Sequence, residues 1–178
     1  MKTWRLRSSL WVPRQPAEVF PFFADAQNLE RLTPPWLSFH IATPQPIEMR
    51  EGTLIDYRLR VRGLPLGWRT RIARWEPPFA FADEQLRGPY TRWHHTHTFT
   101  PQDGGTVLGD EVVMRPRGGP LAGVVMALFV RRDVEQIFRY RAKVMAELFS
   151  ADPDSATLRW QDGPATTAPI SAVAPGTR

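Results

Sequence analysis

The longest hydrophobic pattern in the chain covers residues 120–149 and predicts one continuous helix. Pro120 suits the first position of a helix, where an N–H is not needed, and no Gly or Pro follows Gly123 within the segment. Residues 121–130 are apolar on nearly every side, whereas apolar residues recur at intervals of three and four over 131–149. A helix of roughly 45 Å with one apolar face needs a broad apolar surface to lie on. We expect a sheet to supply it.

Alternation of apolar and polar residues before this helix predicts that sheet. The pattern is clearest over 53–61, where Ile55, Tyr57, Leu59 and Val61 share one face. Turns rich in glycine or proline, at 63–67, 76–78, 88–89 and 103–105, separate the expected strands. The expected strands cover residues 4–12, 36–42, 53–61, 68–75, 79–87, 90–100 and 106–115, and two short helices, 17–24 and 25–32 with Asp25 as a cap, follow the first strand.

This order of elements predicts an α+β fold. We expect a curved antiparallel sheet of about seven strands wrapped on the long C-terminal helix, with the two short helices placed after the first strand. One domain over residues 1–150 accounts for all of these elements. Residues 151–178 are rich in Ala, Pro, Thr, Ser and Gly, which predicts a disordered or loosely docked tail.

Composition narrows the class of protein without naming a function. The chain has 178 residues, of which 42% are apolar, enough for the core of one domain. It has no cysteine, which excludes disulfides and thiolate metal ligands. The first residues lack the apolar segment of a signal peptide, and the run at 121–130 is too short to span a bilayer, so we expect a cytoplasmic protein without a transmembrane segment.

Net charge and a search for common catalytic motifs add little information about the function. The net charge of +5 comes mostly from arginine, which allows weak contact with anionic surfaces but indicates no specific nucleic-acid partner. The sequence contains no Gly-rich phosphate loop, no G-x-S-x-G motif and no H-E-x-x-H motif. It therefore offers no support for a kinase, a hydrolase or a nicotinamide-dependent enzyme.

Four segments carry a resemblance to a known group of proteins: PAEVFPFFADAQNLERLTPPW at 16–36, GTLIDY at 52–57, WEPP at 75–78 and WHHTHTF at 93–99. With the expected element order, they resemble a bacterial branch of the START-like, or SRPBCC, superfamily. These helix-grip domains include the Bet v1-like birch-pollen allergen, polyketide cyclase/dehydratase-like proteins and coenzyme Q-binding START-type proteins. The resemblance covers about residues 1–150. It implies a deep apolar cavity between sheet and helix for a hydrophobic small molecule, and only a minority of members are enzymes.

The segment at 93–99 holds the most candidate chemistry. On a strand, Trp93, His95, His97 and Phe99 share a face, and the aromatic ends indicate that this face points inward. His95 and His97 would then lie about 7 Å apart. They could line a pocket, act as a general acid and base near neutral pH, or bind a metal ion.

A metal would need a third ligand, and no spacing selects one among Asp83, Glu84, Asp110 and Glu111. The sequence therefore predicts no metal site and no cofactor. The alternation of the last strand also leaves open whether Asp110 or Glu111 faces inward.

Other polar residues are expected at the same cavity. The hydroxyl of Tyr57 could donate a hydrogen bond to a carbonyl, and Arg141 falls within the apolar stripe of the long helix. Because a buried arginine requires a partner, we expect Arg141 to pair with Asp110 or Asp83. The complete set of expected ligand-binding residues is Tyr57, Trp68, Phe81, Asp83, Gln85, Trp93, His95, His97, Asp110 and Arg141.

Three functions fit these observations. The favoured one is binding of a hydrophobic small molecule, such as a lipid, a quinone or a polyketide-like compound. The first alternative is an enzyme of the polyketide cyclase/dehydratase type that uses His95 or His97 with Tyr57. The second is a protein- or RNA-interaction module that uses an outward arginine stripe: Arg58, Arg60 and Arg62, with Arg69 and Arg71 beside it.

Overall fold

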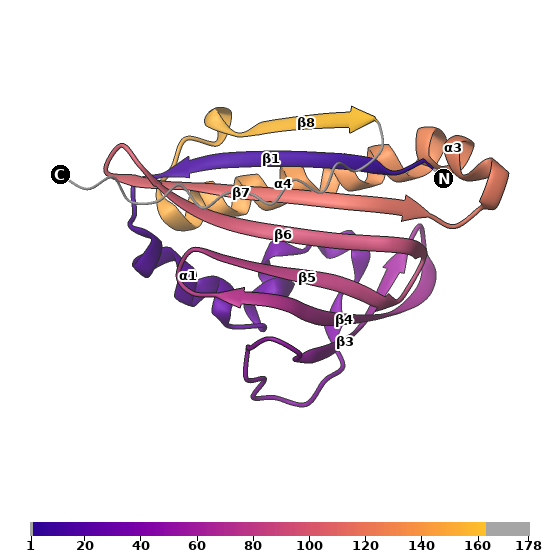
Figure 1. The fold of residues 1–178 in the computed structure, drawn as a ribbon, viewed down its shortest axis with the longest axis horizontal. Coiled ribbons are helices and arrows are strands. Elements are labelled where there is room, and N and C mark those ends of the chain that lie inside the picture. The colour runs from indigo at the N-terminus through magenta and orange to yellow at the C-terminus, as the bar shows by residue number, and fades with distance from the viewer. Residues whose placement is uncertain (1, 163–178) are drawn as a thin grey trace.

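An eight-stranded antiparallel sheet dominates the computed structural model, which describes residues 2–162 (Figure 1). The strand order is β2-β3-β4-β5-β6-β7-β1-β8. The predicted α+β helix-grip architecture is confirmed, with one strand more than expected. The strands are β1 Trp4–Val12, β2 His40–Ile41, β3 Leu54–Val61, β4 Leu64–Glu76, β5 Ala80–Arg87, β6 Tyr90–Gln102, β7 Gly105–Pro116 and β8 Thr157–Asp162.

Helices cover one face of this sheet, and α4 runs behind it in the view of Figure 1. The helical elements are α1 Pro16–Ala24, α2 Asn28–Leu32, η1 Pro35–Leu37, η2 Gly119–Leu121, α3 Ala122–Val125, η3 Met126–Val130, α4 Arg131–Phe149 and η4 Pro153–Ser155. The predicted long helix is present, but η3 within it is a π-helical segment. Backbone angles stay helical at both joints of this segment, so the helix changes its hydrogen-bond spacing without breaking.

Two predicted boundaries near the N-terminal helices are wrong. The expected strand over 36–42 is reduced to His40–Ile41, because Pro34 and Pro35 favour the start of the 3₁₀ turn η1. The second short helix begins at Asn28 rather than at Asp25. The Asp25 carboxylate instead accepts a hydrogen bond from the backbone N–H of Gln27 at 2.9 Å and holds the turn before the helix.

The expected turn over 63–67 is also wrong, because β3 and β4 are joined much more tightly. Val61 pairs with Leu64, which leaves only Arg62 and Gly63 in the turn. Both have positive φ angles, 52° and 80°. Such angles are typical of two-residue hairpin turns whose twist matches that of the strands. Strand β4 therefore starts four residues earlier than its first tryptophan, Trp68.

The first part of the chain after residue 150 is ordered and docked on the domain. Thr157–Asp162 form β8, which pairs with β1 and makes one edge of the sheet (Figure 1). Leu158 and Trp160 pack against the core cluster around Leu6, and the indole N–H of Trp160 donates to Glu135 at 2.6 Å. Residues 163–178 lie outside the described part of the chain, so the predicted tail there, like the domain division at residue 150, stays a prediction.

The interior contains three apolar clusters between sheet and helices. One gathers phenylalanines of α1 and the sheet with Met145 of α4, the second surrounds Leu6 and Phe138, and the third surrounds Ile55 and Tyr57. The α4 side chains that face inward are Val134, Phe138, Arg141, Met145 and Ala146. Arg141 is the one charged residue in that set, and it marks the position of the site.

Candidate functional site

A cavity of about 770 Å³ lies between the sheet and the helices. This volume is within the range of small-molecule sites, and most of the lining is apolar or aromatic. The apolar lining includes Phe22, Phe23, Leu29 and Leu32 from the first helices, Ile55, Tyr57, Leu59, Trp68, Phe81 and Trp93 from the strands, and Val130, Val134, Ile137 and Phe138 from the C-terminal helix.

One end of the cavity is bordered by the β3–β4 turn and by η3. Leu64 and Phe129 belong to the lining there, yet they remain 72% and 45% exposed. The guanidinium of Arg62 donates two hydrogen bonds to Asp133 of α4, at 2.9 and 3.0 Å, and lies 4.9 Å from the Phe129 ring centre. The expectation that Arg62 belongs to an outward stripe is therefore wrong, because the positive φ of this turn residue directs it to the helix.

The polar part of the cavity is a cluster of five side chains from four elements. Asp83 lies on β5, His95 and His97 on β6, Asp110 on β7 and Arg141 on α4. Strand register brings them together, because Asp83 pairs with His95 and His97 pairs with Asp110. The two imidazole centres are 3.8 Å apart, much closer than the spacing expected from an ideal strand. We call these five residues the polar cluster.

Asp110 is the common acceptor of this cluster. Its Oδ1 lies 2.9 Å from His95 Nε2, 2.9 Å from His97 Nδ1 and 3.5 Å from Arg141 Nη2. The predicted pairing of Arg141 with Asp110 is confirmed. Of the two acids left open by the sequence, Asp110 is the one that faces inward. Glu111 points to the other face and accepts a hydrogen bond from Arg7.

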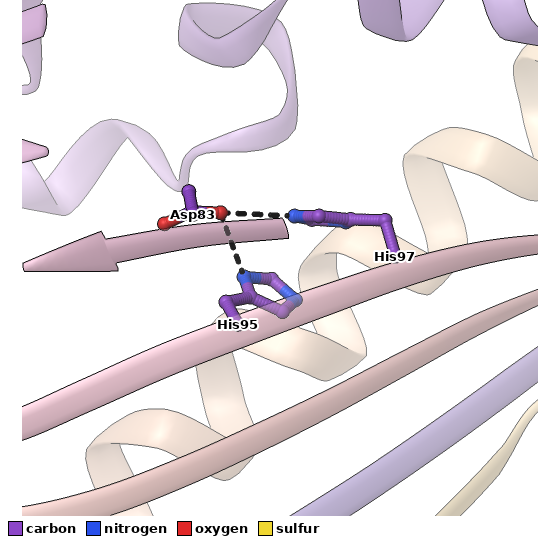
Figure 2. A group of neighbouring side chains, drawn as sticks. All are labelled: Asp83, His95 and His97. Carbon is purple, nitrogen blue, oxygen red and sulfur yellow. Dashed lines mark hydrogen bonds and ion pairs between the residues drawn. The ribbon is translucent and has the colours of Figure 1, made fainter. Parts of the chain in front are cut away.

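The surrounding contacts assign the tautomers of both histidines. A carboxylate only accepts, so His95 presents Nε2–H to Asp110. His97 Nδ1 lies 2.9 Å from Asp110 Oδ1 and 3.3 Å from Arg141 Nη2, and because a guanidinium only donates, Nδ1 accepts from Arg141. The other ring nitrogens, His95 Nδ1 and His97 Nε2, both face Oδ2 of Asp83, at 3.8 and 3.1 Å (Figure 2). His97 therefore carries a proton on Nε2 and donates it to Asp83 Oδ2.

The pKa values of the two histidines shift in opposite directions. Burial lowers the pKa of His97, but its hydrogen bonds to Asp110 and Asp83 outweigh burial and raise the pKa above the ordinary value. For His95, burial and the charge of His97 lower the pKa to about 4. Near neutral pH, His95 is therefore a neutral ring.

Both carboxylates of the cluster stay ionised. Burial raises the pKa of Asp110, but the charge of Arg141 and the histidine hydrogen bonds hold it well below the ordinary value. Burial also raises the pKa of Asp83, and the hydrogen bond from His97 together with the charges of the neighbouring histidines outweighs it and lowers the pKa. The two carboxylates thus face the Arg141 guanidinium and the two histidine rings, so each buried anion has polar partners. The Nε of Arg141 is buried and has no hydrogen-bond partner among the described residues.

The structure places most of the predicted site residues around the cavity. Those that line it are Tyr57, Trp68, Phe81, Asp83, Trp93, His95, His97 and Arg141. Asp110 lies behind the histidines, outside the lining. Gln85 is wrongly predicted, because its side-chain amide donates to the Tyr90 carbonyl at 2.8 Å and accepts from the Tyr90 N–H at 3.3 Å. It closes the β5–β6 turn.

Thr70 is the hydrogen-bond partner of both Tyr57 and Trp68 on the cavity wall. The Trp68 indole donates to the Thr70 hydroxyl at 3.0 Å. Burial and the charge of Asp83 raise the pKa of Tyr57 above its ordinary value, against the effect of a hydrogen bond with Thr70. Tyr57 is therefore a neutral phenol at the cavity.

Sequence reasoning missed several apolar lining residues. Phe22 and Phe23 of α1 and Phe129 of the π-helical segment were not selected as site residues, although all three line the cavity. Phe138 and Ile137 could have been found, because both belong to the apolar stripe that predicted the helix. Nothing in the pattern distinguishes stripe residues that fill the core from those that border the cavity.

The outward arginines are interleaved with acids. Arg69 makes two hydrogen bonds with Asp56, both at 2.8 Å, and Arg71 pairs with Glu84. These pairs neutralise the charge that the interaction-module hypothesis requires. Of the five arginines in the predicted stripe, Arg62, Arg69 and Arg71 are therefore paired with acids.

The sheet, the C-terminal helix and the enclosed cavity define a helix-grip protein. Residues 3–150 match the model of the family described as polyketide cyclase / dehydrase and lipid transport, and the chain belongs to this family. The predicted SRPBCC relationship is thereby confirmed. No curated protein matches the sequence.

Solved structures share the fold at low sequence identity. The protein TTHA0849 from Thermus thermophilus has a TM-score of 0.63 and 16% identity, and the match covers 80% of this chain and 94% of that one. The protein Ara h 8.0201 has a TM-score of 0.54 and 16% identity, with 81% of this chain and 99% of that one covered.

A further match is the di-domain ARO/CYC StfQ from the steffimycin biosynthetic pathway, with a TM-score of 0.61 and 16% identity. It covers 83% of this chain and 50% of that one. At these identities, the likenesses establish the fold alone. Among the described residues, none of the helices has the length and apolar character needed to cross a membrane.

Proposed function

We propose that the protein binds a hydrophobic small molecule that carries one electron-rich polar group, such as the carbonyl of a quinone or polyketide-like compound. The observation that carries this proposal is the contrast within the cavity. Its wall is mostly apolar and aromatic, and its charged side chains are few: those of the polar cluster, the Arg62–Asp133 pair, Asp25 and Arg117. Such a cavity favours an apolar body with its polar end in a fixed direction.

Apolar burial supplies most of the affinity in this proposal, at about 25 cal/mol per Å² of surface removed from water. Aromatic rings on the wall suit a flat ligand: Trp68 and Trp93 pack edge to face, with centres 5.3 Å apart. Arg141 presents positive charge to the cavity and attracts a carbonyl or enolate oxygen. The family description, which includes lipid transport, supports the same class of ligand.

The test is an equilibrium titration with three probes: a long-chain fatty acid, 1,4-naphthoquinone and a hydroxyanthraquinone. Tryptophan fluorescence reports binding, and we expect saturable one-to-one binding of at least one ring compound. Leu59→Arg places a charge in the cavity wall and should weaken binding at least tenfold, whereas Leu86→Arg, at an exposed position outside the lining, should not. Equal binding by both variants, or no saturable binding of any probe, would contradict the proposal.

A cyclase or dehydratase activity is the second candidate. It is favoured by the hydrogen bond between His97 and Asp83 at the cavity wall, because a carboxylate that orients an imidazole is a common arrangement in proton transfer. The neutral phenol of Tyr57 lies on the same wall and could donate to a substrate carbonyl. Turnover of a poly-β-ketone or β-hydroxy carbonyl substrate, abolished in His97→Gln with the fold intact, would establish it. Binding without turnover would favour a carrier.

A further inference from the structure

We infer that Asp83, His95 and His97 form a binding site for a divalent transition-metal ion. Each offers one ligand atom, and these three atoms lie within 4.8 Å of one another. Figure 2 shows the two imidazoles directed at the same Asp83 oxygen. The inference does not depend on the organic ligand proposed above, because the three residues belong to the protein alone.

The outer contacts of the histidines support this assignment. Histidines that bind metals usually donate the other ring N–H to a carboxylate, which fixes the tautomer and orients the ring. Asp110 fills this role for His95, through Nε2 at 2.9 Å. It also lies 2.9 Å from His97 Nδ1, the nitrogen that Arg141 Nη2 contacts at 3.3 Å. The nitrogens left free of Asp110 are the two that face Asp83.

The distances from Asp83 to the two histidines are close to those of a coordinated set. Ligand atoms about 2.1 Å from one ion are about 3.0 Å apart at a right angle and about 3.4 Å apart at a tetrahedral angle. His97 Nε2 is 3.1 Å and His95 Nδ1 is 3.8 Å from Asp83 Oδ2. The proton that His97 shares with Asp83 occupies the same place, so ion binding replaces that proton.

The ligand set identifies the class of ion. Two imidazoles and one carboxylate suit Fe(II), Co(II) or Zn(II) better than calcium or magnesium. All three ligands line the cavity, which leaves the remaining coordination positions on the cavity side for water or a ligand oxygen. Asp110 offsets part of the added charge, whereas Arg141, 3.5 Å from Asp110, opposes it and limits the affinity.

The test uses the full chain, stripped of metal by a chelator and titrated with Co(II) in the absence of any organic ligand. We expect one ion per chain and a visible spectrum typical of a nitrogen- and oxygen-coordinated site. Asp83→Asn and His95→Gln should each weaken binding at least 100-fold. His40→Gln, at an exposed histidine outside the cavity, is the matched control and should bind as the wild type does. Asp110→Asn should weaken binding by about 10- to 100-fold and keep the ligand set.

X-ray absorption of the Co(II)-loaded wild type decides the question even where a variant fails to fold. Two imidazole ligands per ion would support the inference. Fewer than two imidazoles, no saturable one-to-one binding, or wild-type affinity in folded Asp83→Asn would overturn it.

Discussion

Arg141 Nη2 of α4 lies 3.5 Å from Asp110 Oδ1 of β7, so a buried ion pair joins the C-terminal helix to the middle of the sheet. Both side chains are almost fully buried. Removing two charges from water costs free energy when such a pair forms. Removing one partner also lowers stability, because the remaining charge stays buried without compensation.

The first prediction concerns the stability of this pair. Arg141→Leu should lower the free energy of unfolding by about 3–5 kcal/mol, because it leaves Asp110 charged and partly unpaired in the interior. Arg139→Leu, on the exposed face of the same helix, is the control and should change it by less than about 0.5 kcal/mol. Urea unfolding measures both, and equal effects in the two variants would contradict the buried-pair interpretation.

The second prediction concerns access to the cavity. The Arg62–Asp133 contact joins the β3–β4 turn to α4 at the end of the cavity where Leu64 and Phe129 are exposed. Arg62→Ala should speed release of a bound naphthoquinone several-fold in stopped-flow fluorescence and leave stability close to that of the wild type, because exposed ion pairs contribute little.

Arg69→Ala provides the comparison for this rate, because Arg69 makes an equivalent two-bond contact with Asp56 away from the cavity. Its release rate should equal that of the wild type. If Arg62→Ala and Arg69→Ala release the probe equally fast, the contact at Arg62 does not control access.

The third prediction is a pH dependence at the tyrosines. Burial is the main cause that raises the pKa of Tyr57 and Tyr90, with contributions from the charges of Asp83 and Asp133 respectively. The unfolded chain therefore loses these protons first as pH rises, so their contribution to stability is complete below about pH 10 and declines above it.

Phenolate absorbance near 295 nm measures this directly. In Tyr140→Phe, which keeps only these two tyrosines, we expect no phenolate signal at alkaline pH until the circular dichroism of the fold is lost. Ionisation of either tyrosine in the folded protein near pH 10 would show that the phenol is not buried as described.

The fourth prediction concerns β8. Trp160→Ala removes an indole that packs on the second core cluster and donates to Glu135. We expect a loss of about 1–3 kcal/mol in unfolding free energy, whereas Arg159→Ala, whose side chain is exposed on the other face, should be nearly neutral. Equal stability of the two variants would mean that β8 contributes little to the fold.

Periodicity predicted much of this architecture, because long elements repeat their pattern many times. The helix stripe and the alternation around Tyr57 indicated which faces point inward, and the same argument placed His95 and His97 on the cavity side. Short elements gave weaker signals: β2 has only two residues, and β8 has too few large apolar residues for its alternation to stand out.

The composition of the polar cluster could not be predicted from spacing. Asp83 meets the histidines through the β5–β6 register, and Asp110 meets them through the β6–β7 register. Both registers depend on turn geometry and on pairing across the whole sheet. For the same reason Gln85, although on the expected face of its strand, turns to the nearby Tyr90 backbone instead of the cavity.

The most direct test of ligand binding in the cavity follows the tryptophan indole N–H signals by ¹H–¹⁵N NMR while 1,4-naphthoquinone is added. Trp68 and Trp93 line the cavity, whereas Trp11 and Trp160 do not. We predict that the signals of Trp68 and Trp93 shift and saturate at one equivalent, while those of Trp11 and Trp160 stay in place. Shifts confined to Trp11 and Trp160, or no saturable shift at Trp68 and Trp93, would contradict binding in the cavity.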